Sequence, residues 1–186
     1  MYVLFVILIA VGLALGIYGV VVQRGALVVK LDRKMTFISI IWGALSLAAA
    51  CAGYGIGKWI LSGDIAGHSI FWAHVLAGVL LAAIGIRMLI RAFKKHSVFE
   101  HRMENIDIKH DTILSLQLCG NALLAGVACG LLEYSLLLVI LAFFLAAVLF
   151  AVGGYVSGRS LGIAPSSKAY AIGGGLLCLL SILLQL

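Results

Sequence analysis

The chain has 186 residues, of which 64% are hydrophobic and only 11% are charged, and its mean hydropathy is +1.21. Soluble domains carry roughly 25% charged residues, so this composition excludes an ordinary soluble protein, a disordered chain and a nucleic-acid-binding module. The formal net charge of +6, from 13 Lys and Arg against 7 Asp and Glu, is typical of the basic cytoplasmic loops of a membrane protein.

Stretches without charge, each close to the about 20 residues that cross a bilayer, follow one another along the chain. They predict six membrane-spanning helices over residues 1–23, 35–57, 69–86, 112–132, 134–158 and 169–186. Lipid-exposed backbone must satisfy its own hydrogen bonds, which favours helices over sheet. Only Glu133 separates the fourth and fifth spans, so we predict a tight hairpin over residues 131–135. The first span lacks a basic leader and a cleavage site, and we expect it to be retained.

The distribution of basic residues predicts the orientation. With the N-terminus outside, the loops after the first, third and fifth spans hold 12 of the 13 Lys and Arg, and only Lys58 lies outside. We therefore predict a multi-pass protein of the cell (inner or plasma) membrane with both termini outside. The polar segment 94–111 carries three of the five His. We interpret it as a cytoplasmic charged linker, with a regulatory or metal-sensing loop as the alternative.

The two halves of the chain resemble each other. The second span ends with GYGIGK at 53–58, and the fifth ends with GYVSGR at 154–159. A duplicated unit with an odd number of spans places its second copy upside down, which is common in secondary transporters. We therefore predict an all-α integral membrane protein with a 3+3 inverted repeat. The repeats are residues 1–93 and 112–186, joined by the linker 94–111.

Short motifs recur in a fixed order along nearly the whole chain. They are Arg24-Gly25, Trp42-Gly43-Ala44, Gly53 to Gly57, Gly85-Ile86-Arg87-Met88, Asn121-Ala122, Gly126-Val127, Gly158 to Gly162 and Gly173-Gly174. Together they resemble the MntP-type manganese efflux family of the LysE superfamily of small exporters. The resemblance implies metal-handling carboxylates in the first, second and fourth spans. Those positions fall on Gly16, Ser46 and Asn121, so the chain resembles a divergent member without these carboxylates.

Polar and small residues within the spans are the candidates for a substrate pathway. The predicted pathway residues are Gly16, Tyr18, Ser46, Cys51, Gln117 and Asn121. Amide and hydroxyl oxygens coordinate small ions or bind neutral solutes, and they also join helices by hydrogen bonds, which is the structural alternative. Cys51 and Cys119 leave open a soft-metal, thiol-dependent carrier. We expect Arg87 and Arg91, one turn apart, to reach cytoplasmic lipid head groups.

These features predict a small secondary exporter for a cation, manganese by resemblance, or for a neutral solute. The alternative is a transport-inactive homologue that acts as a membrane partner or assembly subunit. The sequence has no Walker-type loop, nucleophile elbow or HExxH motif, so we expect neither an enzyme nor a bound cofactor. The expected partners are the lipid bilayer and a second copy of the chain or another membrane protein, with no nucleic acid.

Overall fold

The computed structural model describes residues 2–27, 33–62, 70–93, 108–162 and 164–185, although the side chains of 24, 27, 33–42, 70 and 108–118 lie outside the described part. The described elements are six helices. They are α1 (Tyr2–Leu27), α2 (Arg33–Ser62), α3 (Ile70–Phe93), α4 (Ile108–Leu131), α5 (Leu136–Leu161) and α6 (Ala164–Leu183). The predicted all-helical fold and the turn between the fourth and fifth helices are confirmed. Most of the predicted linker 94–111 lies outside the described residues.

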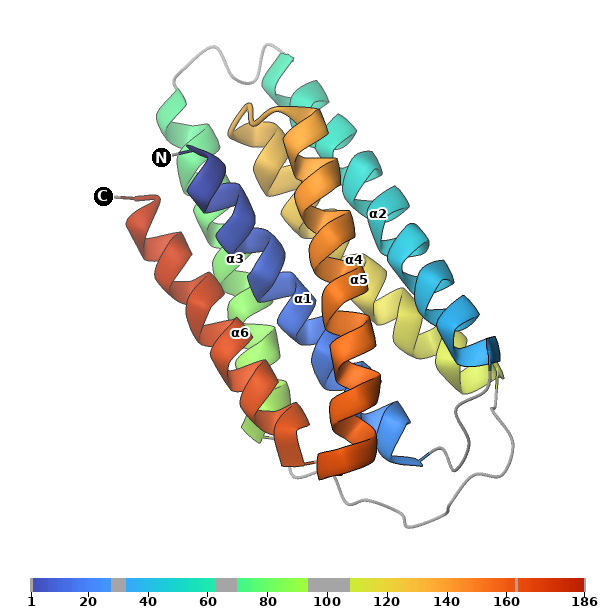
Figure 1. Ribbon diagram of the computed structural model, residues 1–186. Coiled ribbons are helices and arrows are strands. Elements are labelled where there is room, and N and C mark those ends of the chain that lie inside the picture. The colour runs from blue at the N-terminus through green and yellow to red at the C-terminus, as the bar shows by residue number, and fades with distance from the viewer. Residues whose placement is uncertain (1, 28–32, 63–69, 94–107, 163, 186) are drawn as a thin grey trace.

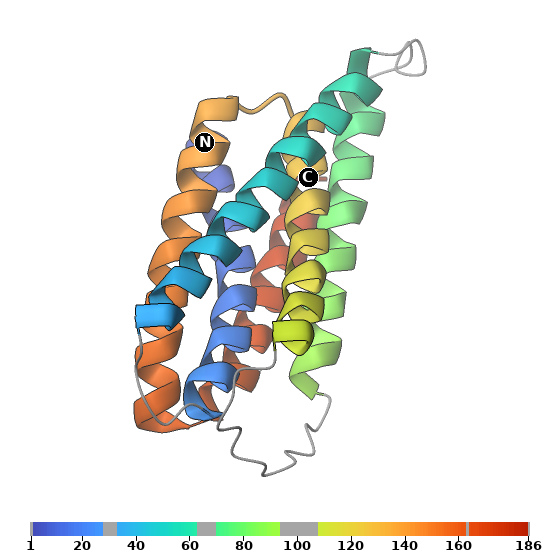
Figure 2. The same cartoon turned by 90° about the vertical axis from the view of Figure 1, so that its right-hand side faces the viewer.

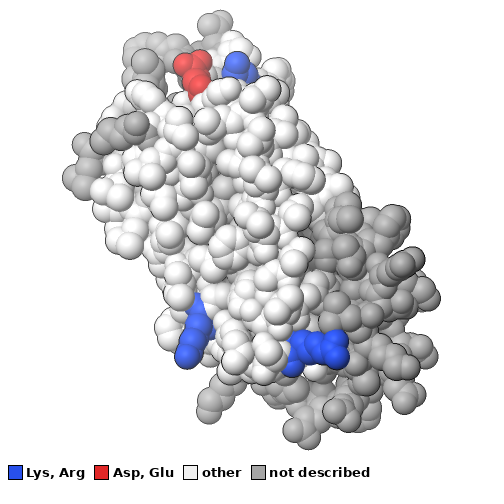
Figure 3. Space-filling view, in the orientation of Figure 1, with Lys and Arg blue, Asp and Glu red and all other residues white. Residues whose placement is uncertain are grey.

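Five of the helices, α1, α2, α3, α5 and α6, are long and apolar enough to cross a membrane. Their outward faces carry large apolar side chains: Leu137, Leu149, Val156 and Leu179 are each more than 60% exposed. Among the residues that the structure describes, Figure 3 shows the charged ones towards the two ends of the visible face, with uncharged residues between them. An uncharged belt between charged ends is the surface that a protein presents to a bilayer.

Antiparallel and crossing helices form one elongated bundle (Figure 1). The helix α1 packs against α5 and α6, α2 runs along α4, and α3 runs along α6. Figure 2 shows that α2 crosses the bundle at an angle to its neighbours. Both chain termini lie at the same end of the bundle, as an even number of crossings requires (Figure 1).

The turns between helices follow from local backbone chemistry. Gly162 ends α5 with φ 69° and ψ −149°, a conformation that essentially only glycine adopts, and Pro165 in the first turn of α6 begins the next helix. Between α4 and α5, Glu133 has φ 54°, a left-handed conformation usually taken by glycine at the end of a helix. The amide of Tyr134 returns to the carbonyl of Cys129 at 3.3 Å, which closes the end of α4.

The α4–α5 turn is also tied to α2. The Tyr54 hydroxyl donates a buried hydrogen bond of 2.7 Å to the backbone carbonyl of Tyr134. Burial, followed by the neighbouring Cys129 and Tyr2, raises the pKa of Tyr134 to about 12. The Tyr134 hydroxyl is therefore protonated at neutral pH and offers no negative charge to a cation at this end of the bundle.

Glycines let α2 and α4 approach until their backbones touch. The carbonyl oxygen of Ala50 in α2 lies directly against Gly126 in α4. One turn further, a Cβ added at Gly130 would lie 3.2 Å from the Cα of Gly57. Close backbone approach through small residues is how helices gain packing energy inside a membrane, where the hydrophobic effect between helices is absent.

Replacing Gly126 with Ala is expected to destabilise the protein, because the new methyl group would overlap the Ala50 carbonyl. Overpacking of this kind costs about 2 kcal/mol, which corresponds to a melting temperature lower by at least about 4 °C. Thermal unfolding of the purified protein in detergent measures the shift. The matched control is Gly120→Ala on the same helix, where an added Cβ meets no atom within 4 Å. Equal melting temperatures for the two variants would show that the α2–α4 contact is not tight.

Candidate functional site

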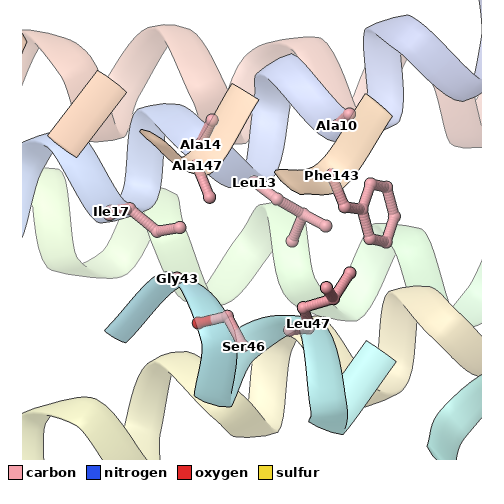
Figure 4. Close-up of a pocket in the computed structure, with 10 residues that line it drawn as sticks. Ala10, Leu13, Ala14, Ile17, Gly43, Ser46, Leu47, Phe143 and Ala147 are labelled. Atoms are coloured by element: carbon pink, nitrogen blue, oxygen red, sulfur yellow. The ribbon is translucent and has the colours of Figure 1, made fainter. Parts of the chain in front are cut away.

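A small cavity lies in the middle of the bundle between α1, α2, α4 and α5. It has a volume of about 30 Å³, which is enough for at least one water molecule, and it is partly open rather than enclosed. The residues that line it are Ala10, Leu13, Ala14, Ile17, Gly43, Ser46, Leu47, Ala122, Phe143 and Ala147. Figure 4 shows Leu13 and Ile17 of α1 across the cavity from Ser46 and Leu47 of α2. The hydroxyl of Ser46, which is 8% exposed, is the one polar side-chain group in this lining.

A second buried polar group is the amide of Asn121 on α4, which is not itself part of the cavity lining. Asn121 is 5% exposed and directly precedes Ala122, which lines the cavity. Arg87 of α3 donates a hydrogen bond from Nη1 to Asn121 Oδ1 at 3.4 Å. An amide within an apolar bundle needs such a partner, because leaving a buried acceptor unpaired costs about 1–3 kcal/mol.

Gly16 of α1 packs against a methionine of α3, which takes up the space where a side chain would lie. A Cβ added at Gly16 would lie 3.2 Å from Met88 Cε and 3.6 Å from its sulfur. The Met88 Cε methyl group also lies against Gly173 of α6, and the Met88 side chain is 1% exposed. The Met88 thioether therefore fills the slot between two glycines, next to the cavity-lining Ile17.

Of the predicted pathway residues, Ser46 is the one in the described cavity lining, and Tyr18 and Cys51 lie outside it. Tyr18 is half-buried, and its ring meets that of Phe150 edge to face at a centroid distance of 6.2 Å. Cys51 is a half-buried free thiol on α2. Gln117 lies on α4, but its side chain is outside the described part. A role for these residues in transport stays a prediction.

The two arginines have different partners in the protein. Arg87 is exposed and reaches Asn121, and Arg91 hydrogen-bonds the side chain of Tyr170 on α6. The predicted contact of Arg87 and Arg91 with lipid head groups stays a prediction. Sequence reasoning missed Met88, Leu13 and Phe143 as neighbours of the site, because apolar side chains in an apolar span carry no distinguishing signal.

The oxygen donors at the site are neutral. Ser46 contributes a hydroxyl oxygen and Asn121 an amide oxygen, both of which coordinate hard cations such as Mn²⁺ alongside water. Across the described part of the chain, no three His, Cys, Asp or Glu side chains gather where they could hold a metal ion.

An apolar outer surface and long apolar helices packed closely through glycine are the features of a multi-pass membrane protein. The chain belongs to the MntP family, because the family profile described as "Putative manganese efflux pump" matches residues 29–184. This confirms the resemblance drawn from the motifs.

Relatives support the same family over most of the chain. A protein of Methanobrevibacter smithii named "Putative manganese efflux pump MntP" is 26% identical over 178 residues, covering 95% of this chain and 93% of the relative. The protein of the same name in Clostridium perfringens strain 13 is 24% identical over 203 residues, covering 98% of this chain and 93% of the relative. The protein of the same name in Shouchella clausii is 33% identical over 93 residues, covering 50% of this chain and 49% of the relative. No solved structure gives a significant match.

Proposed function

We propose that the chain exports manganese, or a chemically similar divalent cation, from the cell by alternating access. The observation that carries the proposal is the position of the two buried oxygen donors. Ser46 lines the central cavity, and Asn121 directly precedes Ala122 of its lining, in a bundle whose relatives are named manganese efflux pumps. A transport-inactive assembly subunit is not favoured by these relatives.

The proposed architecture is a 3+3 inverted repeat that relates α1 to α4, α2 to α5 and α3 to α6. Matched contacts support it. Gly57 of α2 lies against the carbonyl oxygen of Val127 in α4, and Gly158 of α5 lies against that of Val22 in α1. The shift in numbering that relates Val22 to Val127 also relates Gly16 to Asn121, so these two residues occupy equivalent places.

The contact between α3 and α6 fits the same symmetry. Gly78 lies against Ser181 near one end of this pair, and Ser181 donates a hydrogen bond of 2.7 Å to the Gly78 carbonyl. Towards the other end, Gly85 and Gly174 lie against each other. The shift in numbering that relates Gly78 to Gly174 also relates Gly85 to Ser181. The proposed symmetry therefore maps the Gly78–Ser181 contact onto the Gly85–Gly174 contact.

The cavity lies at the centre of this proposed symmetry. Ser46 and Ala147 are equivalent residues of α2 and α5, and both line it. Ile17 and Ala122 are equivalent residues of α1 and α4, and they line it too. A central site between inverted halves is where secondary transporters bind their substrates. We propose that the two halves move apart to admit a hydrated cation, as alternating access requires.

The proposed orientation places both termini outside the cell, with Lys58 outside and Arg159 inside. Cysteine labelling tests it in a variant whose four native cysteines are replaced. Lys58→Cys is expected to react with a membrane-impermeant maleimide on intact cells. Arg159→Cys is expected to react only after the membrane is opened. Both residues are exposed in the protein, so access across the membrane decides the result. The reverse pattern would overturn the orientation.

Manganese retention in living cells tests the proposed export. Cells producing the chain are loaded with Mn²⁺, transferred to manganese-free medium, and assayed for cellular manganese over time. We expect a faster loss than in cells with an empty vector, and no faster loss in cells producing equal amounts of Ser46→Val. Equal loss from cells with the wild-type chain and the empty vector would contradict export.

A further inference from the structure

Two consecutive residues of α3 contact the two equivalent residues of the proposed repeat. Met88 fills the space beside Gly16, and Arg87 hydrogen-bonds Asn121. The arginine brings a full positive charge within hydrogen-bond distance of a buried oxygen donor.

The charge on Arg87 has no described carboxylate to neutralise it. Among side chains that the structure describes, the one acidic group is Glu133, which lies in the α4–α5 turn beyond the end of α4. Arg91, one turn along α3, instead hydrogen-bonds the side chain of Tyr170 on α6. A cation that binds Asn121 therefore meets an electropositive side of the site.

We propose that Arg87 limits the affinity of the site for its cation, because the guanidinium competes with the transported cation for Asn121 Oδ1. While Arg87 holds this oxygen, a substrate cation cannot coordinate it, and the two positive charges repel each other. A cation binds there only after the guanidinium leaves. This inference rests on the proposed export of a divalent cation and names the residue that limits its affinity.

The structure provides a route for the guanidinium to leave. Arg87 is exposed rather than enclosed, and α3 ends at Phe93, less than two turns further along. A long arginine side chain near a helix end extends readily to the lipid head groups. Its hydrogen bond to Asn121, at 3.4 Å, joins the charge to a neutral amide and not to a carboxylate, so it is broken more easily than an ion pair.

Three variants separate the effect of charge from that of shape. Arg87→Gln removes the charge, and Arg87→Lys keeps it without the planar guanidinium. Arg91→Gln is the matched control, because it removes the same charge one turn away. Mn²⁺ binding to each full-length protein in detergent is followed by the loss of the electron paramagnetic resonance signal of free Mn²⁺. Melting temperatures are recorded alongside.

We expect Arg87→Gln to bind Mn²⁺ at least about tenfold more tightly than the wild type, and Arg87→Lys and Arg91→Gln to stay within about threefold. In flux assays with vesicles, we expect Arg87→Gln to lower the KM for Mn²⁺ more than it changes the maximal rate. If the wild type binds Mn²⁺ and Arg87→Gln leaves the Kd unchanged or raises it, the inference about Arg87 is overturned while the proposed function stands. Lower melting temperatures in both Arg87 variants at an unchanged Kd would show a structural role and would also overturn it. No binding in any variant would overturn the proposed function as well.

Discussion

Replacing Asn121 with Asp is expected to slow Mn²⁺ transport, and adding Arg87→Gln to that variant is expected to restore and exceed the wild-type rate at low Mn²⁺. The new carboxylate would face the Arg87 guanidinium, whose Nη1 already lies 3.4 Å from Oδ1 of the amide. Two opposite unit charges about 4 Å apart attract by about 4 kcal/mol at an effective dielectric constant of about 20. The single variant therefore locks Arg87 in place.

Removing Arg87 in the second step leaves the carboxylate free for the substrate. The attraction of a divalent ion to that carboxylate is about twice as large, or about 8 kcal/mol before the cost of removing water. We expect Mn²⁺ to bind the double variant at least about 100-fold more tightly than it binds Asn121→Asp alone. Binding and vesicle flux of the wild type, both single variants and the double variant form a double-mutant cycle. Additive effects would show that residues 87 and 121 do not interact.

Filling the central cavity is expected to stop transport without unfolding the protein. Ser46→Val and Ala147→Val add methyl groups from opposite sides of a space of about 30 Å³. Each is expected to lower Mn²⁺ flux into vesicles at least about tenfold, because the altered cavity no longer holds a water or an ion. Ser46→Ala removes the hydroxyl but keeps the space, so we expect a smaller loss.

The controls for the cavity variants are a lipid-facing substitution and a stability measurement. Leu149 of α5 is 68% exposed, and Leu149→Ala is expected to leave flux unchanged. The melting temperatures of the cavity variants should stay within about 4 °C of the wild type, since an overpacking cost near 1 kcal/mol is spread over a chain of this size. Full flux through folded Ala147→Val would place the pathway elsewhere.

Much of the fold could be predicted because hydrocarbon imposes simple rules on a chain. Stretches without charge located every helix, and the lone Glu133 located the α4–α5 turn. The ends of the helices were harder. The helix α2 continues past Lys58 to Ser62, and α3 continues to Phe93. Basic side chains near a membrane surface extend towards water and do not end a helix, so a charge marks the edge of the hydrocarbon rather than the end of the element.

The site was less predictable than the fold. Resemblance to a family pointed to Gly16, Ser46 and Asn121, but nothing in the sequence pairs Asn121 with Arg87, which is 34 residues away on another helix. The fit of Met88 against Gly16 was equally hidden, because any methionine in an apolar span fits the same pattern. Such contacts depend on how helices cross, which local periodicity does not encode.

Initial rates of Mn²⁺ entry into sealed vesicles containing the purified full chain test most directly whether neutral oxygen donors carry a divalent cation here. A triple variant with Gly16→Asp, Ser46→Glu and Asn121→Asp is measured beside the wild type, after its melting temperature shows that it folds. We predict saturable Mn²⁺ flux through the wild type, above that of protein-free vesicles. Flux through the triple variant alone, or through neither protein, would contradict Mn²⁺ transport by the residues that this chain has.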